Sequence, residues 1–225
     1  MKFGVLQFPG SCDERDAVLA CSQVGDAELV WHGETSLDGI DAVVVPGGFS
    51  YGDYLRAGAI ARFAPVMEDV IAFAREGGPV LGICNGFQVL CEARLLPGAL
   101  LPNEGLRFLC RQVELEVIGT DTIATSACTP GERLSIPVKH MSGRWFAPDD
   151  TVAELEERGQ IVFRYAAGQN PNGSIADVAG VSNERGNVVG LMPHPEHAVD
   201  PLTGSADGLR LFESIAAAQP LAAAA

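Results

Sequence analysis

Short apolar runs alternate with segments of helical periodicity from the N-terminus to residue 95, and this alternation constrains the fold more than any other feature. Strands are expected at residues 2–7, 28–31, 42–45 and 79–83, and helices at 15–24, 65–75 and 87–95. The run Val43-Val44-Val45 has no polar residue, which is typical of a strand covered on both faces of a sheet. Strands that alternate with helices in this way predict a parallel sheet with right-handed crossovers.

After Arg111 the pattern changes, and strand-like runs predominate up to Met192. Strands are expected at residues 113–117, 134–138, 161–165, 175–181 and 188–192, with one helix at 149–158 and a last helix at 206–218. The alanine-rich end after Pro220 is expected to fray. Because neither a repeat nor a linker separates the halves, the sequence predicts one domain over residues 1–225. We expect an α/β fold: an open, largely parallel, flavodoxin-like sheet flanked by helices, with a small antiparallel extension.

The composition disfavours several classes of protein. A formal net charge of −14 over 225 residues argues against nonspecific binding to nucleic acid or to an anionic membrane. No apolar run approaches the roughly 20 residues that span a bilayer, and the first strand is too short for a signal-peptide core. We therefore expect a cytoplasmic protein. The six cysteines form no Cys-x-x-Cys pair, which predicts reduced thiols and no structural zinc site.

The segment Gly82-Ile83-Cys84-Asn85-Gly86 places a cysteine between two glycines, where an expected strand meets an expected helix. So sharp a turn strains its central residue and requires small neighbours. The side chain then projects at the N-terminus of the helix, where the dipole and free backbone N–H groups favour the reactive thiolate. Taken alone, the segment is equally compatible with a buried cysteine that only packs as a small hydrophobic side chain.

A glycine-rich loop, Pro46-Gly47-Gly48-Phe49-Ser50-Tyr51-Gly52, follows the strand at 42–45. Part of it matches the Gly-x-Ser-x-Gly pattern of serine hydrolases, but Ser50 does not lie at the strand end, and Gly58 interrupts the helix that should follow. A plain glycine turn is a second interpretation. The interpretation we favour is that Gly47 and Gly48 present backbone N–H groups to a developing oxyanion.

A third loop, Pro193-His194-Pro195-Glu196-His197, follows the strand at 188–192. All three loops are expected at the carboxyl ends of strands, where the chemistry of open α/β sheets gathers. Histidine can take a proton from a thiol and return it to a leaving group, and a carboxylate orients such a histidine. In an extended segment, His194 and Glu196 would point to the same side. A polar surface loop and a metal site at His194 and His197 are the alternatives, and the lack of a His-x-x-x-His helix disfavours the metal.

Together, Gly82-Ile83-Cys84-Asn85-Gly86-Phe87-Gln88 and Pro193-His194-Pro195-Glu196 make the chain similar to the class I (triad) glutamine amidotransferases. A closer resemblance, to the glutaminase subunits of de novo purine synthesis, covers nearly the whole chain. It rests on the block from Pro46 to Gly58, on Leu101-Pro102-Asn103 with Arg107-Phe108, on Asn170-Pro171-Asn172-Gly173-Ser174, and on residues 192–197.

The resemblance implies a role for each of these residues. Cys84 would attack the side-chain amide of L-glutamine, and His194, oriented by Glu196, would act as base and then as acid. The N–H groups of Gly48 (or Gly47) and Asn85 would form the oxyanion hole. Gln88 would help to hold the substrate. His140 is a further candidate for substrate contact, with a structural histidine as the alternative.

The resemblance also implies partners. Ammonia released from glutamine would pass to a large synthetase subunit that uses ATP and Mg²⁺, with a small accessory subunit in the same complex. This chain has no Gly-x-x-x-x-Gly-Lys-Ser/Thr loop, so it is expected to bind no ATP itself. No other cofactor and no metal are expected on this chain.

One segment departs from the family pattern. Where the family commonly has His-Gly-Glu-Gly-Arg, this chain has His140-Met141-Ser142-Gly143-Arg144, which puts details of glutamine binding or docking in doubt but not the reaction. Two other functions stay under consideration. A triad amidotransferase or cysteine hydrolase of another pathway is disfavoured by the block at 46–58. A subunit that only binds a partner is disfavoured by the intact Cys84, His194 and Glu196.

Overall fold

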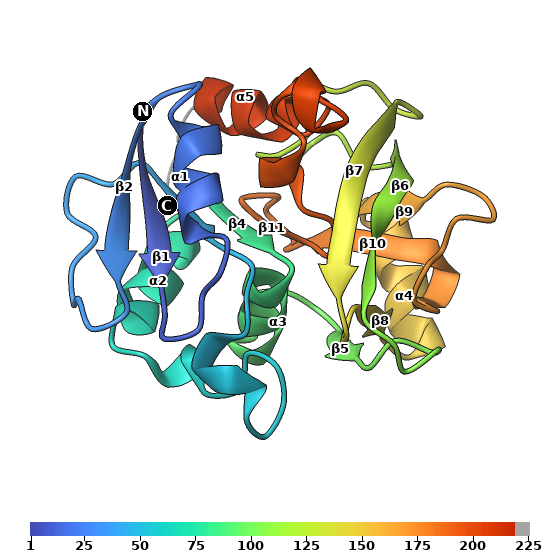
Figure 1. The fold of residues 1–225 in the computed structure, drawn as a ribbon, viewed down its shortest axis with the longest axis horizontal. Helices are drawn as coiled ribbons and strands as arrows, with labels where there is room; N and C mark the ends of the chain where they lie inside the picture. The colour runs from blue at the N-terminus through green and yellow to red at the C-terminus, as the bar shows by residue number, and fades with distance from the viewer. Residues whose placement is uncertain (219–225) are drawn as a thin grey trace.

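The computed structural model describes residues 1–218, and a nine-stranded sheet runs through the molecule (Figure 1). Its strand order is β2-β1-β3-β4-β11-β10-β9-β6-β7. The strands of this sheet are β1 (Lys2–Gln7), β2 (Asp26–Trp31), β3 (Ala42–Val45), β4 (Val80–Ile83), β6 (Leu109–Val117), β7 (Arg133–His140), β9 (Ile161–Tyr165), β10 (Val178–Ser182) and β11 (Val188–Leu191). A separate antiparallel pair joins β5 (Ala99–Leu101) to β8 (Arg144–Phe146).

The strands β2, β1, β3, β4 and β11 pair in parallel. Every residue of β3, β4 and β11 is buried, as expected for central strands with continuous apolar runs. Because these strands run in one direction, their carboxyl ends share one edge of the sheet. The loops that follow β1, β3, β4 and β11 therefore meet there.

The other half of the sheet is antiparallel: β10 pairs with β11 and β9, and β6 pairs with β9 and β7. This part continues the main sheet and does not form a separate layer. The strand β7 lies at its edge, which explains how Pro137 is tolerated within a strand, since proline removes a ladder hydrogen bond. The predicted α/β fold with an antiparallel extension is confirmed.

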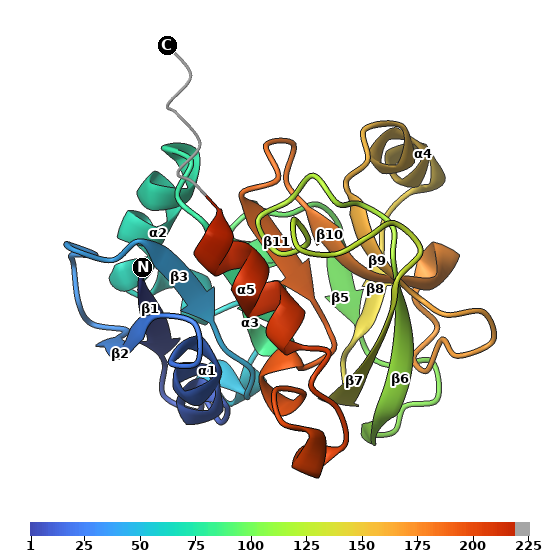
Figure 2. The same ribbon diagram turned by 90° about the horizontal axis from the view of Figure 1, so that it is seen from above.

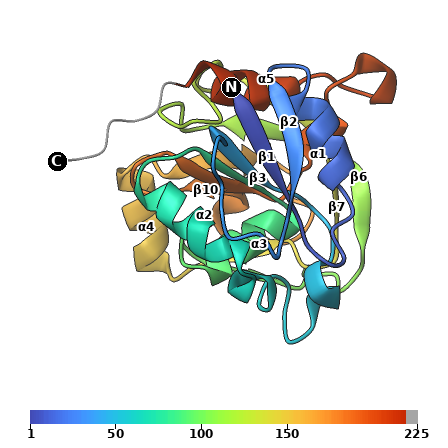
Figure 3. The ribbon, with the colours of Figure 1, turned by 90° about the vertical axis from the view of Figure 1, so that its left-hand side faces the viewer.

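Helices cover both faces of the sheet. They are α1 (Glu14–Cys21), α2 (Val66–Arg75), α3 (Asn85–Glu92), α4 (Asp149–Glu157) and α5 (Leu209–Ala217). Figure 3 shows α1 and α5 on one face of the parallel half and α2 and α3 on the other, and Figure 2 shows α4 beside the antiparallel half. Within residues 1–218 no helix is both long and apolar enough to cross a membrane.

Several predicted boundaries differ from the structure. The run at 175–181 begins with a single 3₁₀ turn, Ile175–Asp177, so that β10 starts only at Val178. The last helix starts at Leu209 and not at residue 206. The short strands β5 and β8 were not predicted. The alanine-rich end after Pro220 lies outside the described residues.

Candidate active site

Cys84 occupies a strained turn between β4 and α3. Its φ is 51° and its ψ is −103°, in a region that residues with a Cβ atom rarely adopt. The flanking glycines explain how the turn fits: a Cβ atom on Gly86 would collide with the carbonyl oxygen of Val45, and one on Gly82 would lie 2.5 Å from a methyl of Leu90. The helix α3 can thus pack close to the sheet, and the strained turn that the sequence predicts is present.

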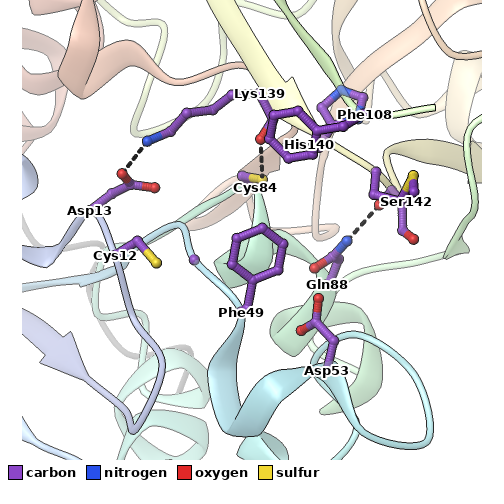
Figure 4. A pocket seen from close by; sticks show the side chains of 12 residues that line it. Cys12, Asp13, Phe49, Asp53, Cys84, Gln88, Phe108, Lys139, His140 and Ser142 are labelled. Carbon is purple, nitrogen blue, oxygen red and sulfur yellow. Dashed lines mark hydrogen bonds and ion pairs between the residues drawn. The ribbon is translucent and has the colours of Figure 1, made fainter.

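The Cys84 side chain is 5% exposed and lines a cavity of about 170 Å³ (Figure 4). Its Sγ lies 3.8 Å from the carbonyl oxygen of Lys139, on the edge strand β7. At the start of α3, the N–H of Asn85 donates to no residue of the described chain. The reacting sulfur of a cysteine nucleophile would therefore face the cavity with a free N–H donor beside it.

His194 and Glu196 form a buried pair directly after β11. Nδ1 of His194 lies 2.6 Å from Oε1 of Glu196, and the two residues are 1% and 3% exposed. The sequence argument assumed an extended segment here, but the segment is not extended. Pro195–His197 forms a 3₁₀ turn, and this turn, together with the non-helical backbone of His194, brings the two side chains together.

The electrostatics of this pair favour the imidazolium form of His194. Burial alone would lower the pKa of His194, but the negative charges of Glu196 and Cys84 outweigh burial and raise the pKa well above its ordinary value. Nε2 of His194 is buried and has no hydrogen-bond partner within residues 1–218. As an imidazolium, His194 therefore carries a proton on Nε2 that no other described group accepts.

Asp13, which the sequence analysis missed, joins the same cluster from the loop after β1. Its carboxylate forms an ion pair with Lys139 and lies 3.3 Å from Nε2 of His197 and 3.6 Å from Nδ1 of His194. Burial would raise the pKa of Asp13, but the hydrogen bond from His197 and the charges of His194 and Lys139 lower it to about 2. The sequence does contain a signal for Asp13, because this residue lies in the loop after the carboxyl end of a parallel strand, as Cys84 does.

This cluster also has the composition of a metal site. The ligand atoms of Asp13, His194, Glu196 and His197 lie within 4.8 Å of one another. The Lys139 ammonium on Asp13 would repel a metal cation, and Glu196 is engaged with His194. The arrangement thus fits a hydrogen-bonded carboxylate–histidine cluster better than a metal centre.

The two glycines after β3 lie in different places. Gly48 lines the cavity with a φ of 142°, and its N–H donates to no described residue. Gly47 does not line the cavity. Its carbonyl accepts from the N–H groups of Cys12 and Asp13, and its α-carbon packs against Asp13 and the ring of His194. The geometry favours Gly48 as the oxyanion donor of the two, and Gly47 as a residue that leaves room for the histidine.

A hydrogen-bonded row connects the glycine-rich loop to α3. The Asn85 side chain accepts from the N–H of Ser50 at 2.9 Å and donates to Oε1 of Gln88 at 2.8 Å and to Oδ1 of Asp53 at 3.2 Å. Gln88 in turn donates to the carbonyl of Ser142 at 2.5 Å. Within residues 1–218 the buried Ser50 hydroxyl has no hydrogen-bond partner, so none of these residues supplies the base that a serine nucleophile requires.

His140 is held in one tautomer by Asn103. The Asn103 amide donates to the carbonyls of Arg107 and His140, so its oxygen must face Nδ1 of His140, 3.0 Å away. Nδ1 therefore carries the proton, and Nε2 is a buried acceptor without a described partner. Burial, with a smaller contribution from the charge of His194, lowers the pKa of His140 to about 3 and keeps the ring neutral.

The cavity is lined by half of the residues that the sequence singled out: Gly48, Cys84, Gln88 and His140. Figure 4 shows Cys84, Gln88 and His140 around it, with Asp13, Asp53 and Lys139, which the sequence analysis did not identify. His194, Glu196 and Asn85 do not line the cavity and lie in the surrounding protein.

Replacing Gly47 by alanine is expected to lower the catalytic activity of this site by about 100-fold while the fold is retained. The new Cβ atom would collide with the Asp13 carboxylate and lie 2.6 Å from Cε1 of His194, so the imidazole has to move. Steady-state activity assays and circular dichroism measure the two effects. Gly105→Ala is the matched control, because nothing lies within 4 Å of that position. Unchanged activity of Gly47→Ala would contradict the placement of His194.

Comparison with known proteins points to the same family as the sequence motifs do. The family model of the CobB/CobQ-like glutamine amidotransferase domain matches residues 1–213. The phosphoribosylformylglycinamidine synthase subunit PurQ of Rubrobacter xylanophilus is 60% identical over 96% of this chain and 98% of its own length. The PurQ subunit of Mycobacterium tuberculosis is 60% identical over 95% of each chain. A chain in the structure of PurLQS from Thermotoga maritima superposes with a TM-score of 0.87 at 42% identity, covering 95% of this chain and 96% of that one.

Proposed function

This chain belongs to the CobB/CobQ-like glutamine amidotransferase family, and we propose that it is the glutaminase subunit of a phosphoribosylformylglycinamidine synthase, with Cys84 as its nucleophile. One observation carries the assignment of the site: a cysteine on a strained strand–helix turn lines the cavity, at the edge of the sheet that also carries the buried, hydrogen-bonded pair of His194 and Glu196. An acyl-transfer reaction through a cysteine requires these groups.

In the first half of the reaction, the Cys84 thiolate attacks the side-chain carbonyl carbon of L-glutamine. The C–S bond forms as the carbonyl electrons move to oxygen, and the N–H groups of Gly48 and Asn85 bind the resulting oxyanion. His194, held as imidazolium, donates its proton to the amide nitrogen. The C–N bond then breaks, ammonia leaves, and a γ-glutamyl thioester remains on Cys84.

In the second half, water hydrolyses the thioester. Neutral His194 takes a proton from the water molecule as its oxygen attacks the carbonyl carbon. Collapse of the second oxyanion breaks the C–S bond and releases glutamate. Cys84 is again a thiolate and His194 again an imidazolium. Glu196 keeps the proton of Nδ1 engaged throughout, which fixes the ring for transfer at Nε2.

The released ammonia serves a synthetase subunit in the same complex. We assign the use of ATP and Mg²⁺ to that subunit, and a small accessory subunit to the assembly. The name of the solved relative, PurLQS, supports a complex of this kind. The reaction converts formylglycinamide ribonucleotide to formylglycinamidine ribonucleotide. The chain acts as a single glutamine amidotransferase domain, a proposal supported by the family match over residues 1–213 and by the continuous sheet.

Isotope transfer tests this function. The assembled complex is supplied with formylglycinamide ribonucleotide, ATP, Mg²⁺ and glutamine labelled with ¹⁵N in its amide. We expect ¹⁵N in the amidine of the product and one glutamate per product. Product formation without ¹⁵N, or an absolute requirement for free ammonium ions, would overturn the proposal.

A further inference from the structure

Asp53 is a carboxylate in the cavity that the reaction described above does not use. It is half-buried and lines the same cavity as Cys84 and Gln88. No lysine, arginine or histidine of residues 1–218 forms an ion pair with it. The nearby Arg56 pairs with Glu92, at 2.5 Å. Asp53 thus presents a negative charge to the cavity without a cation of its own.

The other charges on the cavity wall are already matched. The Lys139 ammonium is bound to Asp13, so neither of these groups is free to pair with a ligand. Burial raises the pKa of Asp53 to about 6. A cationic ligand bound beside the carboxylate would lower this pKa again. Of the carboxylates that line this cavity, Asp53 is the one that a positively charged group of the substrate can neutralise.

The backbone around Asp53 is held in an unusual conformation. Tyr51, Asp53 and Leu55 have φ values of 53°, 53° and 69°, all in the left-handed region that side chains disfavour. The Asn85 amide fixes the carboxylate by donating to its Oδ1, and the same amide donates to Gln88. Asp53 is therefore held at a defined place on the side of the cavity that carries Gln88, as Figure 4 shows.

We propose that Asp53 binds the α-ammonium group of the glutamine substrate. This inference rests on the proposed function, in which the side-chain amide of glutamine lies at Cys84. Gln88 and Asp53 then lie along the cavity where the other end of the substrate must be accommodated. A charged hydrogen bond between a carboxylate and a primary ammonium group would make the site selective for an α-amino acid over an amide without that group.

Two alkylating probes that differ only in the ammonium group test the proposal. The first is 6-diazo-5-oxo-norleucine, and the second is 6-diazo-5-oxohexanoate, which lacks the α-amino group. The full chain, assembled with its synthetase subunit, is treated with each probe, and the rate of Cys84 modification is followed by mass spectrometry. We expect the wild-type protein to react about 10- to 100-fold faster with the amino-acid probe, the range expected for a hydrogen bond to a charged group.

The Asp53→Asn variant should lose this preference, because its side chain still accepts from Asn85 but carries no charge. We expect its rate with the amino-acid probe to fall by about 10- to 100-fold and its rate with the des-amino probe to stay unchanged. The KM for glutamine should rise more than kcat falls. Asp53→Glu should retain part of the preference, and Asp38→Asn, an exposed position, should behave as the wild type.

The outcomes separate the two proposals. If the wild-type protein is not modified at Cys84 by either probe, the proposed function fails. If the wild-type protein reacts equally with both probes, or if Asp53→Asn keeps the full preference, the assignment of Asp53 is wrong. Equal slowing with both probes would give Asp53 a purely structural role and would also overturn the assignment. The wild-type comparison decides the question even if the Asp53 variants fold poorly.

Discussion

Cys84→Ala is expected to lower glutamine-dependent synthesis by about 10⁴-fold or more, while synthesis from free ammonium ions persists in the assembled complex. Alanine has the same Cβ atom, so the strained turn gains no new clash, but the atom that forms the thioester is gone. The chemistry of the synthetase subunit does not involve this cysteine. Parallel assays with glutamine and with ammonium chloride measure the two activities.

Cys110→Ala is the matched control for this experiment, because Cys110 is an exposed thiol on β6. It should retain the wild-type activity with both nitrogen donors. Glutamate release by the Cys84→Ala variant at a rate near that of the wild type would mean that another residue is the nucleophile. Loss of the ammonium-dependent activity would point instead to a disrupted complex.

His194→Ala is expected to slow formation of the thioester by about 10²- to 10⁴-fold. The leaving amide nitrogen then receives no proton from a positioned acid, and amide cleavage through an unprotonated nitrogen is unfavourable. Single-turnover mixing of the assembled complex with labelled glutamine, followed by acid quenching, measures the rate directly.

A graded comparison comes from Glu196→Gln. The glutamine side chain still accepts the hydrogen bond from Nδ1 of His194, at the 2.6 Å position of the carboxylate, but carries no charge. The pKa of His194 should fall, and the loss of activity should be smaller than for His194→Ala. Wild-type rates in both variants would contradict the role of the pair. Equal losses in the two variants would mean that His194 depends on the charge of Glu196 for all of its function.

The central part of the fold was predictable because its strands are uninterrupted apolar runs. The bounds of β1, β3 and β9 agree with the expected ones at both ends. Strands of three residues such as β5 and β8 carry too little pattern to be recognised, and they form by pairing with each other across the chain. The segment before β10 contains a 3₁₀ turn whose apolar residue resembles the start of a strand.

The candidate site was predictable where each residue follows a strand of the parallel half. Cys84 and His194 were found in this way, and the family to which their motifs point is confirmed. The pair of Lys139 with Asp13 was not predictable, because 126 positions separate the two residues and only the antiparallel half brings β7 to the edge of the site. Asp53 was hidden in a loop whose left-handed backbone has no simple sequence signature.

Trapping the covalent intermediate tests the role of Cys84 most directly. The assembled complex, turning over ¹³C-labelled glutamine, is quenched in acid and digested, and the peptides are analysed by mass spectrometry. We predict a labelled γ-glutamyl group on the peptide that contains Cys84, absent from the Cys84→Ala variant and lost on treatment with hydroxylamine. A labelled group on Ser50, or steady turnover with no labelled peptide at any time, would contradict the account.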